Sequence, residues 1–167
     1  ALLVSMDAEQ IKKTLNDNLD KFPEAVGINN HMGSRFTTHE MGMDSVMSVL
    51  KARELYFIDS RTSAQTVAEL SAERFSIPTA RRNVFLDNQA DEKAILSQLN
   101  KLEKKAHKYG AAIGIGHPYI STLNALRTWL PTLEDKGIII VRASQLLHPE
   151  SFRQRYARPP PSKGNSS

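Results

Sequence analysis

Four short apolar runs of this chain each end at a cluster of polar residues that could take part in catalysis. The clusters are Asn29-Asn30-His31, Asp59-Ser60-Arg61, Asp87-Asn88 and His117-Pro118. Histidine titrates near neutral pH, so it suits general acid–base chemistry and metal binding. Carboxylates orient such histidines or bind metals, and arginine holds anionic groups. The residue types therefore indicate an active site.

His117 is the first candidate for acid–base chemistry. It follows Gly114-Ile115-Gly116, where missing side chains permit close packing or the close approach of a ligand. Pro118 favours an extended backbone at His117. The alternative is a structural histidine that caps a helix or is held by hydrogen bonds. We favour the functional interpretation because a strand end and flanking glycines occur together.

The segment Asn29-Asn30-His31 precedes a Gly-Ser turn and offers hydrogen-bond donors, acceptors and a possible metal ligand at His31. The alternative is a polar turn in which the Asn side chains bond to their own backbone. The other histidines lie in helical or terminal contexts and are expected at the surface; they are His39, His107 and His148.

Asp59-Ser60-Arg61 combines an anion, a hydroxyl and a cation. Asp59 is suited to orient a histidine or to bind a metal, and Arg61 to pair with Asp59 or to hold an anionic substrate group. A structural Asp–Arg bridge that fastens the loop is the alternative. Asp87-Asn88 is the weaker candidate, because this pair is common in turns.

The apolar runs predict buried strands, because each is brief and bounded by turn residues. We expect strands over 26–29, 56–59, 111–116 and 138–141, and one bent or two short strands within 77–87. Amphipathic stretches lie between them, so the predicted fold class is α/β with a parallel sheet. The carboxyl ends of parallel strands line a ligand crevice or barrel mouth. The four polar clusters are therefore expected to converge on one face.

The spacing of apolar residues and the capping residues predict the helices between these strands. We expect helices capped by Asp7, Thr38, Ser63 and Asp91, a helix over 121–135 that Pro131 shortens, and a short helix over 144–148. The first helix is predicted to end at Pro23, and the third to cover 64–75.

Composition excludes several function classes. The 167-residue chain is 40% hydrophobic and 24% charged, as in ordinary globular proteins. It contains no cysteine, which excludes disulfides, thiolate catalysis and Cys-ligated zinc. No apolar stretch approaches the length of a membrane span, and no signal peptide is recognised. A dinucleotide-binding glycine pattern and a Gly-x-Ser-x-Gly elbow are both missing.

The carboxy-terminal segment differs in composition from the rest. We expect one domain over residues 1–148 and a disordered, basic, Pro/Ser-rich tail over 149–167. A basic tail could touch nucleic acid or anionic lipid. A solvated end is the favoured interpretation because aromatic stacking partners are few, so no nucleic-acid partner is expected.

Four segments together resemble the divergent polysaccharide deacetylase family of bacteria, a distant branch of the NodB-type carbohydrate deacetylases. They are Val26–Ser34, Tyr56–Thr62, Val84–Asp87 and Ile113–Pro118. The resemblance covers residues 1–147, and the Asn-Asn-His-Met-Gly-Ser stretch is its most specific part. It implies an irregular (β/α) barrel that removes N-acetyl groups from amino-sugar polymers with a divalent metal, expected to be zinc. It also implies the periplasm or cell envelope of a Gram-negative bacterium.

Family members begin with a strand that ends in an Asp-Asp pair and later carry a His-Leu-Pro motif. Neither is found here, so the chain resembles the carboxy-terminal two-thirds of such a domain, an incomplete NodB-like barrel. The acidic base and part of the metal shell are then expected outside the chain.

The resemblance also implies roles for individual residues. His117 is similar to the histidine that acts as general acid on the leaving amine, and Asp59 to the residue that orients it. Asn29, Asn30 and His31 stand where other members place an Arg-Pro-Pro-Tyr-like segment that lines the site. We therefore expect His31 to be a metal ligand and Asn29, Asn30 and Arg61 to bind substrate.

The departure from the Arg-Pro-Pro-Tyr-like segment leaves a second function class open. The chain could be a catalytically inactive module of the cell envelope that binds a glycan or a protein. The sequence does not determine the oligomeric state.

Overall fold

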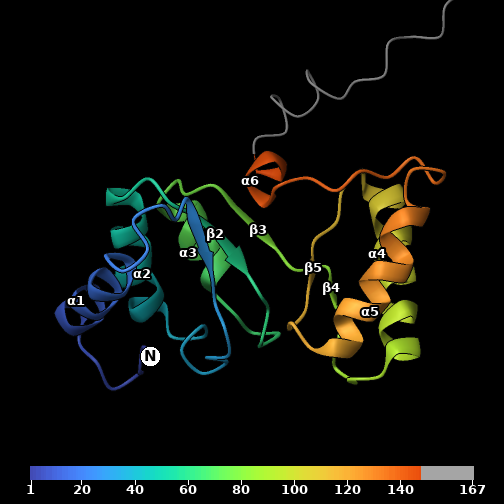
Figure 1. Ribbon diagram of the computed structural model, residues 1–167. Coiled ribbons are helices and arrows are strands. Elements are labelled where there is room, and N and C mark those ends of the chain that lie inside the picture. Colours follow the sequence, from blue (N-terminus) through green and yellow to red (C-terminus); the bar gives the residue numbers. More distant parts are fainter. Residues whose placement is uncertain (148–167) are drawn as a thin grey trace, which may run out of the picture.

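The computed structural model describes residues 1–147, in which helices and parallel strands alternate (Figure 1). The helices are α1 (Ala8–Leu19), α2 (Glu40–Ala52), α3 (Ala68–Arg74), α4 (Glu92–Tyr109), α5 (Ile120–Trp129), the 3-10 helix η1 (Leu130–Thr132) and α6 (Ala143–Leu146). The strands are β1 (Gly27–Asn29), β2 (Tyr56–Asp59), β3 (Thr79–Arg81), β4 (Val84–Phe85) and β5 (Gly114–Ile115). The predicted α/β class is confirmed.

The strands form two parallel sheets rather than one. β1, β2 and β3 pair in that order, whereas β4 pairs with β5. Because all pairs are parallel, the carboxyl ends share one side of each sheet, and the loops after β1, β4 and β5 lie at the lower edge of Figure 1. No closed barrel is present within residues 1–147, as expected for an incomplete NodB-like barrel.

Each sheet belongs to a separate hydrophobic core. The first is built mainly from α1, α2, β2 and α3, and its most deeply buried members include Ile11, Met47, Leu50, Phe57 and Ala72. The second is built mainly from α4 and α5 against β4, and includes Val84, Ile95, Leu99, Ala125 and Trp129. The chain crosses from one packed unit to the other between β3 and β4.

Two helix starts match the capping signals in the sequence. Asp7 and Gln10 form a capping box: Asp7 Oδ1 accepts from the backbone N–H of Gln10 at 2.8 Å, and Gln10 Oε1 accepts from Asp7 at 3.0 Å. Asp91 Oδ1 accepts from the N–H of Ala94 at 2.9 Å. These caps are confirmed. Pro131 shortens the helix as predicted, because α5 ends at Trp129 and the 3-10 helix η1 follows it.

Two other helix starts were predicted wrongly. α2 begins at Glu40 without a side-chain cap, because the hydroxyl of Thr38 donates to the carbonyl of Arg35. α3 begins at Ala68 rather than residue 64, because the hydroxyl of Ser63 holds a local turn by accepting from the N–H of Gln65. His39, expected at the surface, is half-buried at the start of α2, whereas His107 is exposed as predicted.

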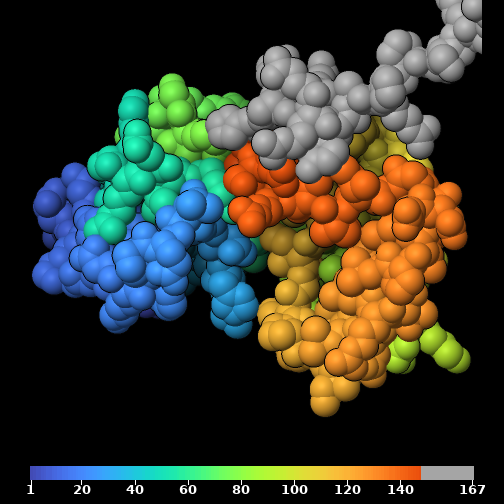
Figure 2. All heavy atoms as spheres, turned by 45° about the horizontal axis from the view of Figure 1, so that its top comes forward, coloured from blue at the N-terminus to red at the C-terminus, as the bar shows by residue number. Residues whose placement is uncertain are grey.

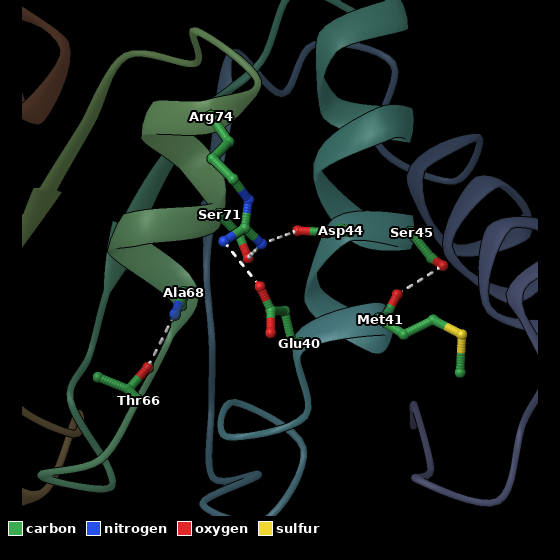
Figure 3. A network of polar contacts seen from close by, with 8 residues as sticks. All are labelled: Glu40, Met41, Asp44, Ser45, Thr66, Ala68, Ser71 and Arg74. Carbon is green, nitrogen blue, oxygen red and sulfur yellow. Dashed lines mark hydrogen bonds and ion pairs between the residues drawn. The ribbon is translucent and has the colours of Figure 1, made fainter.

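An ion-pair network holds α3 against α2 (Figure 3). Arg74 donates to Asp44 at 2.6 Å and lies 2.9 Å from Glu40. The hydrogen bond from Arg74 to Asp44 raises the pKa of the arginine. At the other end of α3, the N–H of Val67 donates to the carbonyl of Thr37 at 2.8 Å. Both ends of α3 therefore have contacts that hold the helix in place.

The predicted strand over 138–141 is wrong. No strand is assigned to these residues, and Ile139 and Ile140 are 53% and 65% exposed. An apolar, β-branched run becomes a strand only beside a neighbour that pairs with it, and none of the described strands does so. Ile138 packs on the second core instead. The chain then reaches α6, which Figure 2 shows at the boundary between the two units.

The remaining expectations concern the lengths of strands, the carboxy-terminal tail and membrane spans. Within residues 77–87 the chain forms two short strands, and β5 is restricted to Gly114–Ile115. The predicted tail over 149–167 and His148 lie outside the described residues. No helix within residues 1–147 is long and apolar enough to cross a membrane.

Separate cores predict separate effects of core truncation. Leu50→Ala should destabilise the first unit and Leu99→Ala the second, each by about 2–5 kcal/mol, because a buried leucine side chain leaves a cavity. Amide hydrogen exchange checks this: Leu50→Ala should lower protection in α1 and α2 more than in α4 and α5, and Leu99→Ala the reverse. Equal loss across both units in both variants would show a single cooperative core.

Candidate active site

His117 lies directly beside the carboxylate of Asp87 at the carboxyl ends of β4 and β5. Its Nδ1 is 3.1 Å from Asp87 Oδ1, and its backbone N–H donates to Asp87 Oδ2. A carboxylate only accepts, so the ring bond places a hydrogen on Nδ1 and leaves the lone pair on Nε2. The histidine is thus held in one orientation through both its ring and its backbone.

The Asp87 carboxylate is fully buried and is satisfied by its neighbours. Besides the two bonds from His117, it accepts from the hydroxyl of buried Thr122 at 3.1 Å. Gly116 makes room for it, because a Cβ there would lie 3.2 Å from Asp87 Oδ2. The glycine beside His117 therefore serves close packing, one of the two roles that the sequence left open.

Three aromatic rings lie close to the ring of His117. The ring of His31 meets it edge-on with centroids 5.6 Å apart, and Phe85 does so at 5.7 Å. Tyr119 stacks on it at 5.1 Å and is itself 48% exposed. His31 belongs to the first unit and His117 to the second. The structure thus brings two of the sequence-predicted residues together, although they are far apart in the chain.

The two asparagines of the β1 loop bind the loop after β2. Asn29 Nδ2 donates to the hydroxyl of Ser60 at 3.0 Å, and the N–H of Ser60 donates to Asn30 Oδ1 at 2.8 Å. Asn30 Nδ2 also lies 3.3 Å from the hydroxyl of Thr62. The asparagine side chains therefore hold the two polar loops together, and their predicted role in substrate binding stays a prediction.

Asp59 is buried at the end of β2 but is not the partner of His117. Its Oδ1 accepts from the N–H of Arg61 at 2.7 Å, whereas Oδ2 has no hydrogen-bond partner among the described residues. The carboxylate that accepts from the ring of His117 is that of Asp87, because β5 pairs with β4 and not with β2. A catalytic role for Asp59 stays a prediction, supported by its unpartnered buried oxygen.

Arg82 was not singled out from the sequence, yet it joins the two polar regions. Its Nε donates to the carbonyl of Ser60 at 2.6 Å and its Nη2 to the carbonyl of Arg61 at 2.9 Å. Burial lowers the pKa of Arg82, the charge of Arg61 lowers it further, and Asp59 opposes both effects. The one sequence feature that could have indicated Arg82 was the pair Arg81-Arg82 between two apolar runs.

Arg61 does not form the bridge considered from the sequence. Within residues 1–147 no ion pair links it to Asp59, and its backbone adopts a left-handed conformation with φ of 47°. Its N–H and carbonyl are both engaged in holding the loop. Binding of substrate by its half-buried side chain remains a prediction.

The described residues do not by themselves form a three-ligand metal centre. No group of three His, Asp or Glu side chains suited to hold an ion occurs within residues 1–147. His31 is the exposed imidazole near His117, whereas the carboxylate of Asp87 is already occupied by hydrogen bonds. A catalytic zinc site usually takes three protein ligands, so residues 1–147 alone do not fit one.

Comparison with known proteins identifies relatives of this arrangement. YibQ of Escherichia coli (strain K12), described as uncharacterized, is 37% identical over 143 residues, which are 86% of this chain and 44% of YibQ. An uncharacterized protein of Haemophilus influenzae is 31% identical over 156 residues, 90% of this chain and 56% of that protein. The chain spans about half the length of these curated relatives.

A solved structure has the same fold. The crystal structure of uncharacterized protein ATU2773 from Agrobacterium tumefaciens C58 matches with a TM-score of 0.76 and 30% identity, over 81% of this chain and 56% of that one. The family described as divergent polysaccharide deacetylase matches residues 1–147. These matches confirm the resemblance inferred from the four polar strand ends. The chain belongs to the divergent polysaccharide deacetylase family.

Proposed function

We propose that the chain is part of a hydrolase that removes acetyl groups from N-acetylated amino-sugar polymers of the cell envelope. The observation that supports this most is the pairing of His117 with buried Asp87 at the carboxyl ends of parallel strands, in a member of a deacetylase family. The family supports a deacetylase-like role, and the substrate and the periplasmic location belong to the proposal.

His117 would act as the general acid of amide hydrolysis. An acidic residue would take a proton from water as the water oxygen forms a bond to the acetamide carbonyl carbon. The C–N bond then breaks, and His117 Nε2 delivers a proton to the leaving nitrogen. The products are acetate and a free amino sugar. Asp87 keeps the ring oriented through Nδ1 and stabilises the imidazolium form that donates the proton.

Residues around His117 offer contacts for a sugar. Tyr119 exposes part of its ring beside His117, and an aromatic face packs well on the apolar face of a sugar ring. Asn29, Asn30 and Arg61 would supply polar contacts from the loops of the first unit. A polymer could thus lie across the carboxyl ends of both sheets.

A divalent metal, with zinc as the favoured ion, remains part of the proposal. A metal would polarise the acetamide carbonyl and activate water, and His31 is the residue of this chain proposed as a ligand. Residues 1–147 do not by themselves gather the three protein ligands of a catalytic zinc.

A binding module without turnover is the second candidate function. Two observations favour it: the described residues lack a three-ligand metal centre, and the side chains of Asn29 and Asn30 are engaged in holding loops. Such a module would bind a glycan or a protein of the envelope through the same surface.

Replacement of His117 separates these functions. His117→Ala should lower the kcat/KM of acetate release from chitin oligomers by about 10²–10⁴-fold, because the leaving amine loses its acid. The assay measures acetate with and without added zinc, and His107→Ala on the exposed face of α4 is the control. Glycan affinity that is equal in wild type and His117→Ala, with no acetate from either across several metals, would favour the binding module.

Replacement of Asp87 tests the orienting role. Asp87→Asn keeps the shape but removes the charge that stabilises protonated His117, so kcat should fall by up to about 10⁴-fold with a smaller effect on KM. Asp135→Asn, at an exposed position of the same unit, is the matched control. A loss in Asp59→Asn with full activity in Asp87→Asn would transfer the orienting role to Asp59.

A further inference from the structure

The two halves of the candidate site belong to units that fold around different cores. His31 and the contacts between the loops after β1 and β2 lie in the first unit. His117 and Asp87 lie in the second unit. Within residues 1–147, no hydrogen bond or ion pair directly joins residues 1–81 with residues 83–147. The relative position of His31 and His117 must therefore be fixed in another way.

Residues 82 and 83 mark the point at which the chain leaves one sheet for the other. The N–H of Arg82 donates to the carbonyl of Asp59 at 2.8 Å, which continues the ladder between β2 and β3. The N–H of Asn83 donates to the carbonyl of Ile113, and Asn83 Oδ1 accepts from the N–H of Ile113 at 2.7 Å. The backbone thus changes partner within a single peptide unit.

The side chain of Arg82 reaches both units. In the first unit its guanidinium donates to the carbonyls of Ser60 and Arg61. Ser60 is also bonded to Asn29 and Asn30, which directly precede His31. A continuous series of hydrogen bonds therefore runs from Arg82 to the segment that carries His31.

In the second unit, the guanidinium of Arg82 lies over the ring of Phe85, 5.3 Å from its centroid. Phe85 in turn contacts the ring of His117. A guanidinium over an aromatic face is attracted by the ring and restrains its position. The same side chain thus has contacts leading to both histidines.

We propose that Arg82 is the positioning residue that joins the two units and sets the placement of His31 against His117. The joining of the two units is inferred from the contacts of Arg82 alone, whereas an effect of Arg82 on turnover rests on the proposed deacetylase function. Arginine suits the role because its planar guanidinium donates to two carbonyls and stacks on an aromatic ring at the same time. The single ammonium group of lysine cannot make both kinds of contact at once.

Distance measurements between the units test this proposal directly. The chain has no cysteine, so Asn18→Cys in α1 and Asn100→Cys in α4 accept spin labels at two chosen sites only. Both positions are exposed, and α1 and α4 lie at opposite ends of the molecule in Figure 1. Pulsed electron paramagnetic resonance then gives the distribution of distances between the two spin labels, and so between the units.

Arg82→Gln should broaden and shift this distribution relative to the labelled parent. Arg82→Lys should also broaden it, because one ammonium group cannot replace the fork, and this variant carries the test if Arg82→Gln fails to fold. Arg81→Gln is the matched control, since Arg81 is half-exposed and pairs with Glu69. It should leave the distribution unchanged.

Two results would overturn the proposal: an unchanged distribution in both folded Arg82 variants, or equal broadening in Arg81→Gln. Where acetate release is measurable, Arg82→Gln should lower kcat by about 10²-fold, since small displacements of catalytic groups are costly. If the wild type releases no acetate, the deacetylase function fails while the distance result still decides the role of Arg82.

Discussion

The buried carboxylate of Asp87 ties together several parts of the second unit. A carboxylate removed from water needs hydrogen-bond donors, because a buried charged group without them costs about 3 kcal/mol or more. Asp87 finds these donors in the backbone and ring of His117 and in the hydroxyl of Thr122. The pairing of β4 with β5 brings the donors to the carboxylate, and Gly116 leaves space for it. One interaction therefore links strand pairing, local packing and the orientation of the candidate acid.

The first unit satisfies its polar strand ends differently. Its loops bind one another through Asn29, Asn30 and Ser60, and Arg82 ties them to the ring of Phe85 beside His117. Neither unit holds both histidines, so the candidate site exists only while the units keep their relative position. This arrangement makes the loops part of the site even where their polar groups are already engaged in hydrogen bonds.

Local signals in the sequence predicted much of this fold, and pairing between distant segments decided the rest. The capping residues Asp7 and Asp91 predicted α1 and α4 because capping depends on nearby backbone. The run at 138–141 looked like a strand, but a strand needs a partner that local sequence does not reveal. The sequence favoured Asp59 over Asp87 because Asp-Asn is common in turns and because the family resemblance gave Asp59 the orienting role. Only the pairing of β4 with β5, which local sequence does not reveal, places Asp87 beside His117. The convergence of His31 and His117, in contrast, followed from the parallel arrangement.

The orientation of the His117 ring tests the central claim most directly. Nitrogen-15 chemical shifts of the neutral ring distinguish a hydrogen on Nδ1 from one on Nε2, with exposed His107 as an internal reference. We predict that His117 carries its hydrogen on Nδ1, held by Asp87, and that Asp87→Asn abolishes this preference. A neutral His117 with its hydrogen on Nε2, or with the same tautomer mixture as His107, would contradict the assignment of His117 and Asp87 as acid and orienting residue.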